Sequence, residues 1–574
     1  MSRILRSASL WPPIRPRSLD ITGSTFDLLE AVGIARRTGL AGSIALLPLG
    51  VAIRDRIEAV VRRAFAERGF LSMSLPALQS RALWERSGRW DVYTSDGSMF
   101  QLQGRDGQSY CLTPTSEELA VATVATDLRS YRDLPLRLYQ SAAKYRDELS
   151  PRGGFIRARE FEMADCYTFD TSIADMHRAV EDLNAACSQA LANLGLPVVH
   201  AIPADGGDIS NAPSTEHVVP ADIGQSEYLE CPHCGYRGDG MVISARFDSD
   251  ETVGAPKSDW VKVIAFRCTV DGQDLVISVA IRGDLQASPR KVLGAIGAES
   301  IRLLDENEFR QVFHLDPHFL NPGVADQFGD RLLFDTSVIE MRNFVIADSE
   351  SATGLRGDCD WNSGPLLAGI LPDKGSNVHA AIAGLRCGRC GEDRLVAHQA
   401  VELGHVFELG TRYSAPMGLS YLDETGASAT PQMACSGIGI GRCLQTLAHV
   451  GRDERGLRWP VNIAPAHVHV MAADEREAAS RRVDDIAATL AAAGVDVLVD
   501  DREVTVGEKF RYAWALGIPH VLVVSDRRRT GGVEWTSRWA GRTVDVVEAE
   551  LPGLLAEFVA TKITATTTES GGTL

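Results

Sequence analysis

Two copies of the pattern Cys-x-x-Cys-Gly, at residues 231–235 and 387–391, constrain this fold more than any other feature of the chain. In each copy a tight turn lets two thiolates converge, which is typical of a metal knuckle. The copies lie much further apart than the roughly 15–20 residues of a simple zinc module. They can share one site only if the segment between them is an inserted domain with adjacent ends. The alternative is two pairs of reduced cysteines that bind no metal.

Length, charge and cysteine content narrow the class of protein. A chain of 574 residues exceeds what one hydrophobic core supports, so we expect roughly three or four domains. The net charge of −18 argues against a surface that is basic throughout, although a local basic groove could still bind nucleic acid. No run approaches the roughly 18 apolar residues of a membrane helix, so we expect no membrane span. Eleven sparse cysteines suit a reducing compartment, and we expect the cytoplasm.

The chain begins with a basic segment that several prolines interrupt. Arg3, Arg6, Arg15 and Arg17 precede the first acid, Asp20, and no apolar signal-peptide core accompanies them. We expect an N-terminal arm, and a transit peptide is the alternative.

Hydrophobic periodicity predicts the first elements. Residues 53–64 carry apolar side chains at helical spacing until Gly69 stops the helix, and residues 70–78 predict a strand at a sheet edge. Between the cysteine pairs, the apolar run 275–281 predicts a strand, and Lys291 falls in the helical stretch that follows. These segments are equally compatible with an ordinary core.

A hairpin is predicted over residues 134–170, where the Pro- and Gly-containing loop 150–154 joins two extended runs. Its return strand would place Arg157, Arg159 and Phe161 on one face. Such a face suits a flat anionic ligand such as a nucleotide, because arginine pairs with phosphate and an aromatic ring can stack. A solvated strand face with surface ion pairs is an equal alternative.

A glycine-rich turn follows the second cysteine pair. Residues 401–413 and 418–422 predict core strands, and the run 437–442 leads from a strand into a helix at 443–450. Glycine there allows a ligand to approach the backbone closely, but the spacing is not that of a dinucleotide fingerprint. Tight packing of the helix against a sheet is the alternative.

Strands and helices alternate from Trp459 onward, which predicts a compact α/β domain with a mainly parallel sheet. The expected elements are strands at 468–472, 495–499 and 520–524 and helices at 475–493 and 509–516. The Thr-, Ser- and Gly-rich end of the chain is expected to be a mobile tail.

Taken together and in this order, segments from about residue 40 to about residue 555 resemble a bacterial-type prolyl-tRNA synthetase, a class II aminoacyl-tRNA synthetase. The segments that carry the resemblance are Leu47–Gly50 (motif 1), Lys144–Phe169 (motif 2), Gly437–Arg442 (motif 3), Pro114–Glu118 (the Thr-x-Glu loop), Glu402–Gly410 with Tyr413 and Ser414, Asp500–Arg502, and Gly517–His520. The resemblance implies ATP, proline and tRNA(Pro) as substrates, Mg²⁺ as the ion that bridges phosphates, and a homodimer formed through motif 1.

The resemblance also implies the fold, which combines α/β and α+β domains. It implies an antiparallel-sheet catalytic core in two parts, at 1–230 and 391–458, and an inserted, editing-like α+β domain at 231–390. An α/β anticodon-binding domain would follow at 459–562, and a flexible tail at 563–574.

The resemblance further implies roles for individual side chains. Arg146 would hold the α-phosphate and the proline carboxylate, while Glu148 would accept a hydrogen bond from the adenine amino group. Phe161 would stack beneath the adenine ring, and Arg442 would lie over its other face near the γ-phosphate. The proline site would be formed by Thr115 and Glu117 at the imino group, by Arg146, and by His405, Phe407 and Cys435 near the ring. Glu402 or Glu408 would hold Mg²⁺.

Three segments depart from the pattern usual in the family. In the insertion Lys291 matches the family's functional lysine, but the usual His-Glu-Leu-Asn-Glu-Val is replaced at 285–290, which bears on hydrolysis of mischarged alanyl-tRNA. Ser150 replaces an arginine that meets the acceptor stem, and Ser436 alters the pocket wall beside motif 3. The alternatives to an active ligase are a paralogue with a specialised acceptor and a non-catalytic tRNA-binding regulator. For Cys231, Cys234, Cys387 and Cys390, Zn²⁺ is the metal considered.

Overall fold

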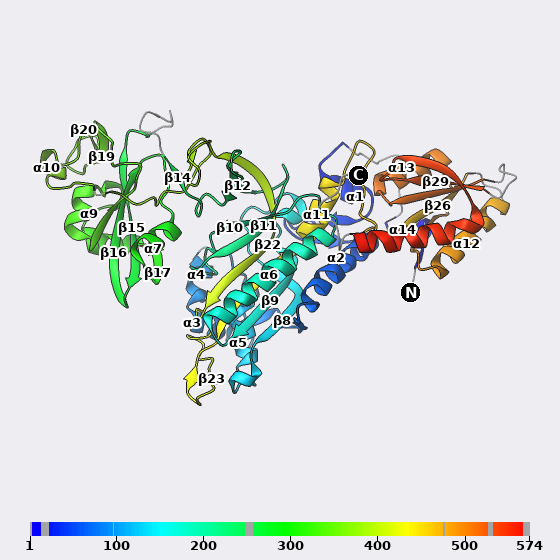
Figure 1. Ribbon diagram of the computed structural model, residues 1–574, viewed down its shortest axis with the longest axis horizontal. Helices are drawn as coiled ribbons and strands as arrows, with labels where there is room; N and C mark the ends of the chain where they lie inside the picture. Colours follow the sequence, from blue (N-terminus) through cyan, green and yellow to red (C-terminus); the bar gives the residue numbers. More distant parts are fainter. Residues whose placement is uncertain are drawn as a thin grey trace. The chain divides into compact units, whose positions relative to one another are not determined.

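The computed structural model describes residues 3–12, 22–95, 97–246, 257–372, 374–473, 477–525 and 532–565. The chain forms two compact units, shown in Figure 1, and each is described by itself. The first comprises Met1–Ala201, His217–Gln225 and Ala400–Leu574; the second comprises Ile202–Glu216 and Ser226–Gln399. Among the described residues, no helix is long and apolar enough to cross a membrane.

An antiparallel sheet forms the centre of the first unit, as predicted for the catalytic core. Five strands of this sheet lie in the order β22-β25-β9-β8-β4, and of the four pairings among them only that of β4 with β8 is parallel. The bounds are β4 (Leu71–Ser72), β8 (Leu136–Tyr145), β9 (Glu160–Asp170), β22 (Val396–Gly410) and β25 (Gln432–Gly439). The helices α2 (Pro48–Ala66), α6 (Ile173–Asn193) and α11 (Ile440–Val450) pack with this sheet (Figure 1).

Helix α2 shows why the periodicity was informative. Pro48 occupies the first turn, where its missing N–H costs no helical hydrogen bond. Ile53, Ile57 and Val61 share one face and are completely buried. The prediction of a helix over 53–64 is therefore confirmed, with two further turns at its ends.

Shorter elements surround the central sheet. They are α1 (Thr25–Ala31), β2 (Ala35–Arg37), β3 (Ile44–Leu46), β5 (Leu78–Ser80), α3 (Arg81–Ser87), α4 (Arg89–Ser95), β6 (Gln101–Gln103), β7 (Ser109–Leu112), α5 (Glu117–Val124), β23 (Tyr421–Leu422) and β24 (Ser428–Ala429).

Three predicted strands are shorter than expected. The segment 70–78 is extended only at Leu71–Ser72 in β4 and at Leu78, where β5 begins. Beyond Met73 the Leu75 N–H donates to the side chain of Gln140, 3.0 Å away, instead of continuing a ladder. The segment 418–422 is extended only at its end, in β23. The return strand of the hairpin begins at Glu160, so Arg157 and Arg159 precede it.

The start of β9 has a physical cause. Residues 154–156 form a single 3₁₀ turn, and the Arg159 N–H donates to the carbonyl of Gly42 at 2.8 Å instead of pairing with β8. A Cβ at Gly42 would lie 2.7 Å from Pro151, so only glycine fits this contact. The predicted face formed by Arg157, Arg159 and Phe161 on one strand is therefore wrong.

The C-terminal part of the first unit is an α/β domain whose sheet has the order β1-β27-β26-β28-β29-β30. Its first four strands are parallel and its last two antiparallel, so the predicted mainly parallel sheet is a mixed one. The elements are β26 (Val468–Ala472), α12 (Glu477–Ala492), β27 (Val497–Asp500), α13 (Val506–Leu516), β28 (His520–Val524), β29 (Gly532–Ser537), β30 (Arg542–Val547) and α14 (Leu551–Ala565).

The two ends of the chain differ from expectation. The start of the expected arm forms β1 (Ile4–Arg6), which pairs with β27 of the C-terminal domain, and residues 13–21 lie outside the described part. The first three residues of the predicted tail continue α14, and residues 566–574 lie outside the described part.

The second unit, which contains the predicted insertion at 231–390, is built on the sheet β17-β15-β16-β18. The strands and helices of this unit include β15 (Val261–Val270), β16 (Gln273–Arg282), α7 (Pro289–Ile296), β17 (Ser300–Leu303), α8 (Glu306–Phe313), α9 (Pro322–Phe328), β18 (Arg331–Phe334), β19 (Phe344–Ala347) and β20 (Leu355–Cys359). The chain enters through β12 (Ser226–Glu230) and leaves after β21 (Arg386–Cys387). The predicted strand at 275–281 and helix at Lys291 are confirmed.

Candidate active site

A narrow cleft in the first unit gathers four of the residues singled out from the sequence. Arg146 follows β8, Phe161 lies at the start of β9, and Arg442 lies in the first turn of α11. These three line the cleft together with Glu148. Its free volume is only about 20 Å³. The side chains that line this cleft therefore leave little free space between them.

Two contacts close this cleft. The Arg146 guanidinium lies over the Phe161 ring, 5.2 Å from its centroid. Glu148 is already paired, because the Arg157 Nε donates to its carboxylate at 2.6 Å. Phe161 thus has one face against a guanidinium group, and Glu148 has one of its two carboxylate oxygens bonded to Arg157.

Arg442 is held by backbone as well as by charge. Its Nε donates to the Ile156 carbonyl at 3.0 Å, and one terminal nitrogen meets both the backbone oxygen and the carboxylate of Glu402 at 3.1 Å. Burial opposes ionisation of Glu402, but a hydrogen bond from His405 and the charges of Arg442 and Arg146 hold the pKa of this carboxyl well below its usual range. Glu402 is therefore a carboxylate at neutral pH.

A second, buried group of residues adjoins the sheet. Thr115 donates to the Glu117 carboxylate, whose two oxygens lie 2.6 and 2.8 Å from the hydroxyl. The Cys435 Sγ lies 3.7 Å from the same carboxylate. On β22, His405 and Phe407 point to one side of the strand and their rings stack at 3.9 Å. Five of the six predicted proline-site residues thus fall into two sets with contacts inside each set, and the sixth, Arg146, lines the cleft.

The sequence did not single out Arg89, at the start of α4. Arg89 is buried, lies 3.2 Å from the Glu117 carboxylate and 3.1 Å from that of Glu118, and donates to the Tyr93 hydroxyl at 2.5 Å. Burial opposes its charge, yet the Glu118 carboxylate and its other neighbours raise the pKa of Arg89 well above its usual value. A single arginine in a short helical stretch offers no sequence pattern that reveals such a partner.

A buried network supports the loop that carries Thr115. The Tyr167 hydroxyl accepts from the Ser116 N–H at 3.2 Å and donates to Asp165 at 2.6 Å. The Asp165 carboxylate also accepts hydrogen bonds from the Lys144 Nζ at 2.8 Å and the Gln140 Nε2 at 2.7 Å. Because every member of this network has a charged or hydrogen-bonding partner, it fixes the position of the loop.

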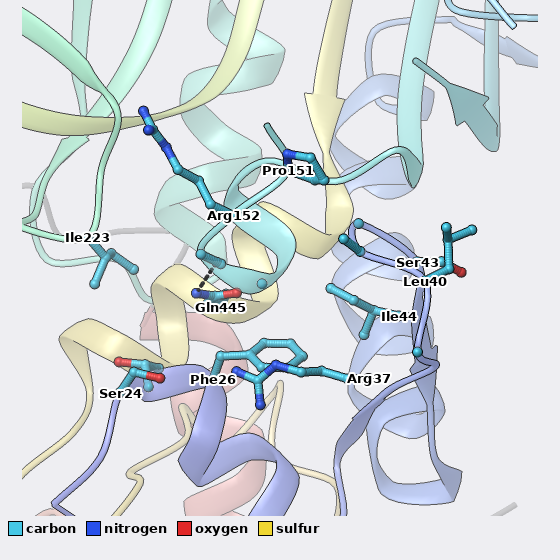
Figure 2. A pocket seen from close by; sticks show the side chains of 16 residues that line it. Ser24, Phe26, Arg37, Leu40, Ser43, Ile44, Pro151, Arg152, Ile223 and Gln445 are labelled. Carbon is cyan, nitrogen blue, oxygen red and sulfur yellow. Dashed lines mark hydrogen bonds between the residues drawn. The ribbon is translucent and has the colours of Figure 1, made fainter. Parts of the chain in front are cut away.

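A larger cavity, of about 540 Å³, lies beside the loop at 150–154 (Figure 2). Its lining includes Phe26, Arg37, Ile44, Arg152, Ile223 and Gln445. The Gln445 amide of α11 accepts from the Phe155 N–H at 2.7 Å and donates to the Gly153 carbonyl at 2.8 Å. Figure 2 shows this side chain joined to the loop that bears Pro151 and Arg152. The same helix thus anchors Arg442 and this loop.

The second unit holds Lys291 on α7. Its Nζ donates to the carbonyls of Ile243 and His379, each at 2.6 Å. Burial lowers the pKa of Lys291 to about 8, although the charges of Asp335 and Asp239 oppose this. His379 is completely buried, and its Nδ1 lies 3.0 Å from the Asp335 carboxylate.

The four cysteines of the two knuckles meet in the second unit. The Sγ atoms of Cys231 and Cys390 are 3.7 Å apart, and those of Cys234 and Cys387 are 3.8 Å apart. All four sulfurs lie within 4.8 Å of one another. The two distant pairs thus lie together, which is the condition for a shared site.

Comparison with known proteins identifies two regions of the chain. The family described as the tRNA synthetase class II core domain (G, H, P, S and T) matches residues 100–450. The family described as the anticodon binding domain matches residues 463–558.

Bacterial relatives match nearly the whole chain. The proline–tRNA ligase of Thermotoga maritima is 32% identical over 560 residues, which cover 93% of this chain and 94% of the relative. The proline–tRNA ligase of Thiobacillus denitrificans is 32% identical over 566 residues, which cover 92% and 96%. Likeness over this length includes the insertion as well as the core.

Solved structures support the fold. The Giardia lamblia prolyl-tRNA synthetase in complex with prolyl-adenylate is 14% identical, with a TM-score of 0.59 over 94% of this chain and 80% of that chain. The Cryptosporidium parvum prolyl-tRNA synthetase complexed with L-proline and AMP is also 14% identical, with a TM-score of 0.57 over 96% and 80%. On the family matches and the near full-length likeness to bacterial ligases, the chain belongs to the proline–tRNA ligase family of class II aminoacyl-tRNA synthetases.

Proposed function

We propose that this chain activates proline with ATP and transfers it to the 3′ end of tRNA(Pro), and that Arg146 and Arg442 supply the charge for the first step. The observation that supports this most is the convergence of Arg146, Glu148, Phe161 and Arg442 on one cleft, within the same unit as the Thr115–Glu117 pair. Proline activation joins a carboxylate to the α-phosphate of ATP and releases pyrophosphate. Two anions must approach, so positioning and charge neutralisation matter more than a side-chain base.

In the proposed complex, Arg146 leaves the Phe161 ring and holds the α-phosphate and the proline carboxylate with its fork of donors. The adenine then stacks on Phe161 and bonds to Glu148. Arg442 exchanges the Glu402 carboxylate for the γ-phosphate while Ile156 still holds its Nε. The closed cleft supports this exchange, because each of these side chains already has a partner that an anion or a ring can replace.

In the same complex, Thr115 and Glu117 hold the imino group of proline, and His405, Phe407 and Cys435 surround its ring. The Glu117 carboxylate suits a secondary ammonium. Mg²⁺ would bridge phosphates through Glu402, whose ionised state favours it as a ligand. Glu408 lies six residues further along the extended strand β22, about 20 Å away, so the two cannot share one ion.

Hydrolysis of alanine wrongly attached to tRNA is a second candidate activity, assigned to the second unit and to Lys291. An ammonium group has three N–H donors, and two of those on Lys291 already meet carbonyls. One donor remains for a substrate. Release of alanine from alanyl-tRNA(Pro), compared between the parent and Lys291→Ala, tests this activity.

The homodimer and the cytoplasmic location also remain predictions. The dimer rests on the likeness of Leu47–Gly50 to motif 1, and the location rests on the sparse cysteine content of the sequence. Light scattering of the purified chain tests the dimer.

The deciding experiment measures proline-dependent pyrophosphate exchange and charging of tRNA with labelled proline, with alanine alongside and Arg146→Ala as the control. Exchange and charging that both vanish in Arg146→Ala would support the proposal. Exchange without charging would favour a paralogue with a specialised acceptor, for which the exposed Ser150 is the first position to examine. Absence of both in the parent would favour a tRNA-binding regulator.

A further inference from the structure

The two Cys-x-x-Cys-Gly knuckles take no part in the proposed activity. Cys231 and Cys387 are completely buried, and Cys234 and Cys390 are partly exposed at the rim of a small apolar cluster that includes Leu229, Ile243, Leu385 and Leu395. All belong to the second unit. A group of four thiols enclosed in this way requires a physical explanation.

The distances between the sulfurs give one. A tetrahedral zinc ion with Zn–S bonds of about 2.3 Å places its sulfurs about 3.8 Å apart. The measured separations are 3.7 Å for Cys231–Cys390 and 3.8 Å for Cys234–Cys387. Disulfide bonds would need S–S distances of about 2.05 Å. We propose that Cys231, Cys234, Cys387 and Cys390 bind one Zn²⁺ as thiolates, in a closed structural site.

The backbone of the two knuckles supports a shared ligand. In each, the N–H of the glycine after the second cysteine donates to the carbonyl of the first cysteine at 2.9 Å, so Gly235 repeats the turn made by Gly391. Both glycines adopt positive φ, at 66° and 72°. Two segments more than 150 positions apart in sequence thus present their sulfurs in the same geometry.

Charge around the knuckles fits the complex. Zn²⁺ bound by four thiolates carries a net charge of −2, which needs nearby donors or cations. The Glu392 N–H points to the Cys390 Sγ at 3.5 Å. Arg246 and Arg386 donate to the carbonyls of the second knuckle at Gly388 and Gly391, 3.2 and 3.4 Å away. Both guanidinium groups are therefore close enough to balance the charge.

Four protein ligands leave no open coordination position, so the ion would be structural rather than catalytic. It would join the entry and the exit of the second unit and close a loop of about 150 residues, which constrains the unfolded chain. The small cluster around the thiols would otherwise have to hold these ends together by itself. The metal is thus expected to stabilise the second unit and to leave proline activation in the first unit unchanged.

The test is the metal content of the full-length, untagged protein purified without added metal or chelator. We expect about one zinc per chain by plasma mass spectrometry, released when a mercurial reagent blocks the thiols. We expect Cys234→Ser and Cys390→Ser to lose the zinc and to lower the temperature of the first unfolding transition. Cys359→Ser is the matched control, because Cys359 lies in the same unit but outside the thiol cluster, and its thiol bonds only weakly at 3.6 Å.

Three outcomes would overturn the proposal. Zinc far below one per chain, together with failure of apoprotein to bind added Zn²⁺ or Co²⁺ with a tetrahedral thiolate spectrum, would show that the thiols are a metal-free pair of knuckles. One iron per chain would identify the site as a rubredoxin-like iron centre instead of a zinc site. Zinc that persists in both serine variants would belong to another site. Pyrophosphate exchange, measured in parallel, keeps this result separate from the success or failure of the proposed ligase activity.

Discussion

In the first unit, the buried Glu117 carboxylate meets a charged partner, Arg89, whereas in the second unit the partly buried Lys291 ammonium meets two neutral carbonyl oxygens. A charge in a poorly solvated place costs free energy unless an opposite charge or strong hydrogen bonds replace the lost water. In the first unit Glu117 has such a partner. In the second unit Lys291 has only dipoles at hydrogen-bonding distance, and burial lowers its pKa to about 8.

The difference shows which site is prepared for a charged ligand. Glu117 is oriented by Thr115 and balanced by Arg89, so a cationic imino group would find a fixed carboxylate. Two of the three N–H donors of Lys291 are instead bonded to the backbone carbonyls of Ile243 and His379. We therefore expect substitutions in the first unit to change proline activation, and substitution of Lys291 to leave proline activation unchanged and to change the pH dependence of stability.

The largest effect is expected for Arg146→Ala. Removing a preorganised donor from a developing charge typically costs two to three orders of magnitude in rate, so kcat for proline-dependent pyrophosphate exchange should fall about 1,000-fold. Arg152→Ala is the matched control, because Arg152 is an exposed arginine on the neighbouring loop. Exchange that survives in Arg146→Ala, or that falls equally in Arg152→Ala, would remove Arg146 from the proposed mechanism.

A smaller, more selective effect is expected for Glu117→Gln. Loss of the charge facing the imino group should raise KM for proline about 100-fold, about 2.7 kcal/mol, and leave KM for ATP nearly unchanged. The control is Glu118→Gln, since Glu118 meets the same Arg89 and also accepts from Ser87. If both variants raise KM for proline equally, Glu117 acts by holding Arg89 and does not bind proline directly.

Local sequence patterns predicted much of the secondary structure. Period, caps and glycine turns predicted the helix over 53–64, the strand-to-helix turn at Gly437–Arg442 and the alternating C-terminal elements, because these depend on neighbours in sequence. The spacing Cys-x-x-Cys-Gly predicted two knuckles, but it left open whether they meet, because they are more than 150 positions apart.

Features that depend on distant partners were not predictable. Pairing of β1 with β27 requires knowledge of which sheet edge is open. Arg89 and Glu117 are 28 positions apart, and no periodicity links them. The start of β9 was misplaced because Gly42, far upstream, captures the Arg159 N–H. The small volume of the cleft results from side-chain conformations, such as that of the Arg146 guanidinium over the Phe161 ring. A sequence motif does not specify these conformations.

In the second unit, Lys291→Met should change how stability depends on pH. The pKa of Lys291 is about 8 in the folded chain, against an ordinary value of 10.5 for a solvated lysine in the unfolded chain. Between these values the unfolded chain binds more protons than the folded one, so stability rises with pH from about 8 to about 10.5. Allowing for partial solvent access, we expect a gain of about 1–2 kcal/mol that Lys291→Met lacks. Chemical unfolding at several pH values measures it, and parallel curves for parent and variant would contradict the assignment.

The smallest effect is expected for Gln445→Met, in the first unit. Gln445 links α11 to the loop at 150–154 through two hydrogen bonds, and Gln445→Met keeps its size but removes both. Each bond contributes about 0.5–1.5 kcal/mol, so we expect kcat/KM for tRNA to fall about five- to tenfold through a loosened loop. Pyrophosphate exchange should change less than about twofold, because Ile156 and Glu402 still hold Arg442.

Thr446→Val and Gln445→Glu test whether this loss arises from the loop. Thr446 is the next residue of the same helix, is completely buried, and has a hydroxyl without a hydrogen-bond partner among the described residues, so Thr446→Val should leave both activities unchanged. Gln445→Glu keeps the acceptor for the Phe155 N–H but loses the donor to Gly153, and an intermediate tRNA defect is expected. An equal loss of exchange and charging in Gln445→Met would show that the side chain supports the ATP cleft as a whole, and the loop would then have no separate part in accepting tRNA.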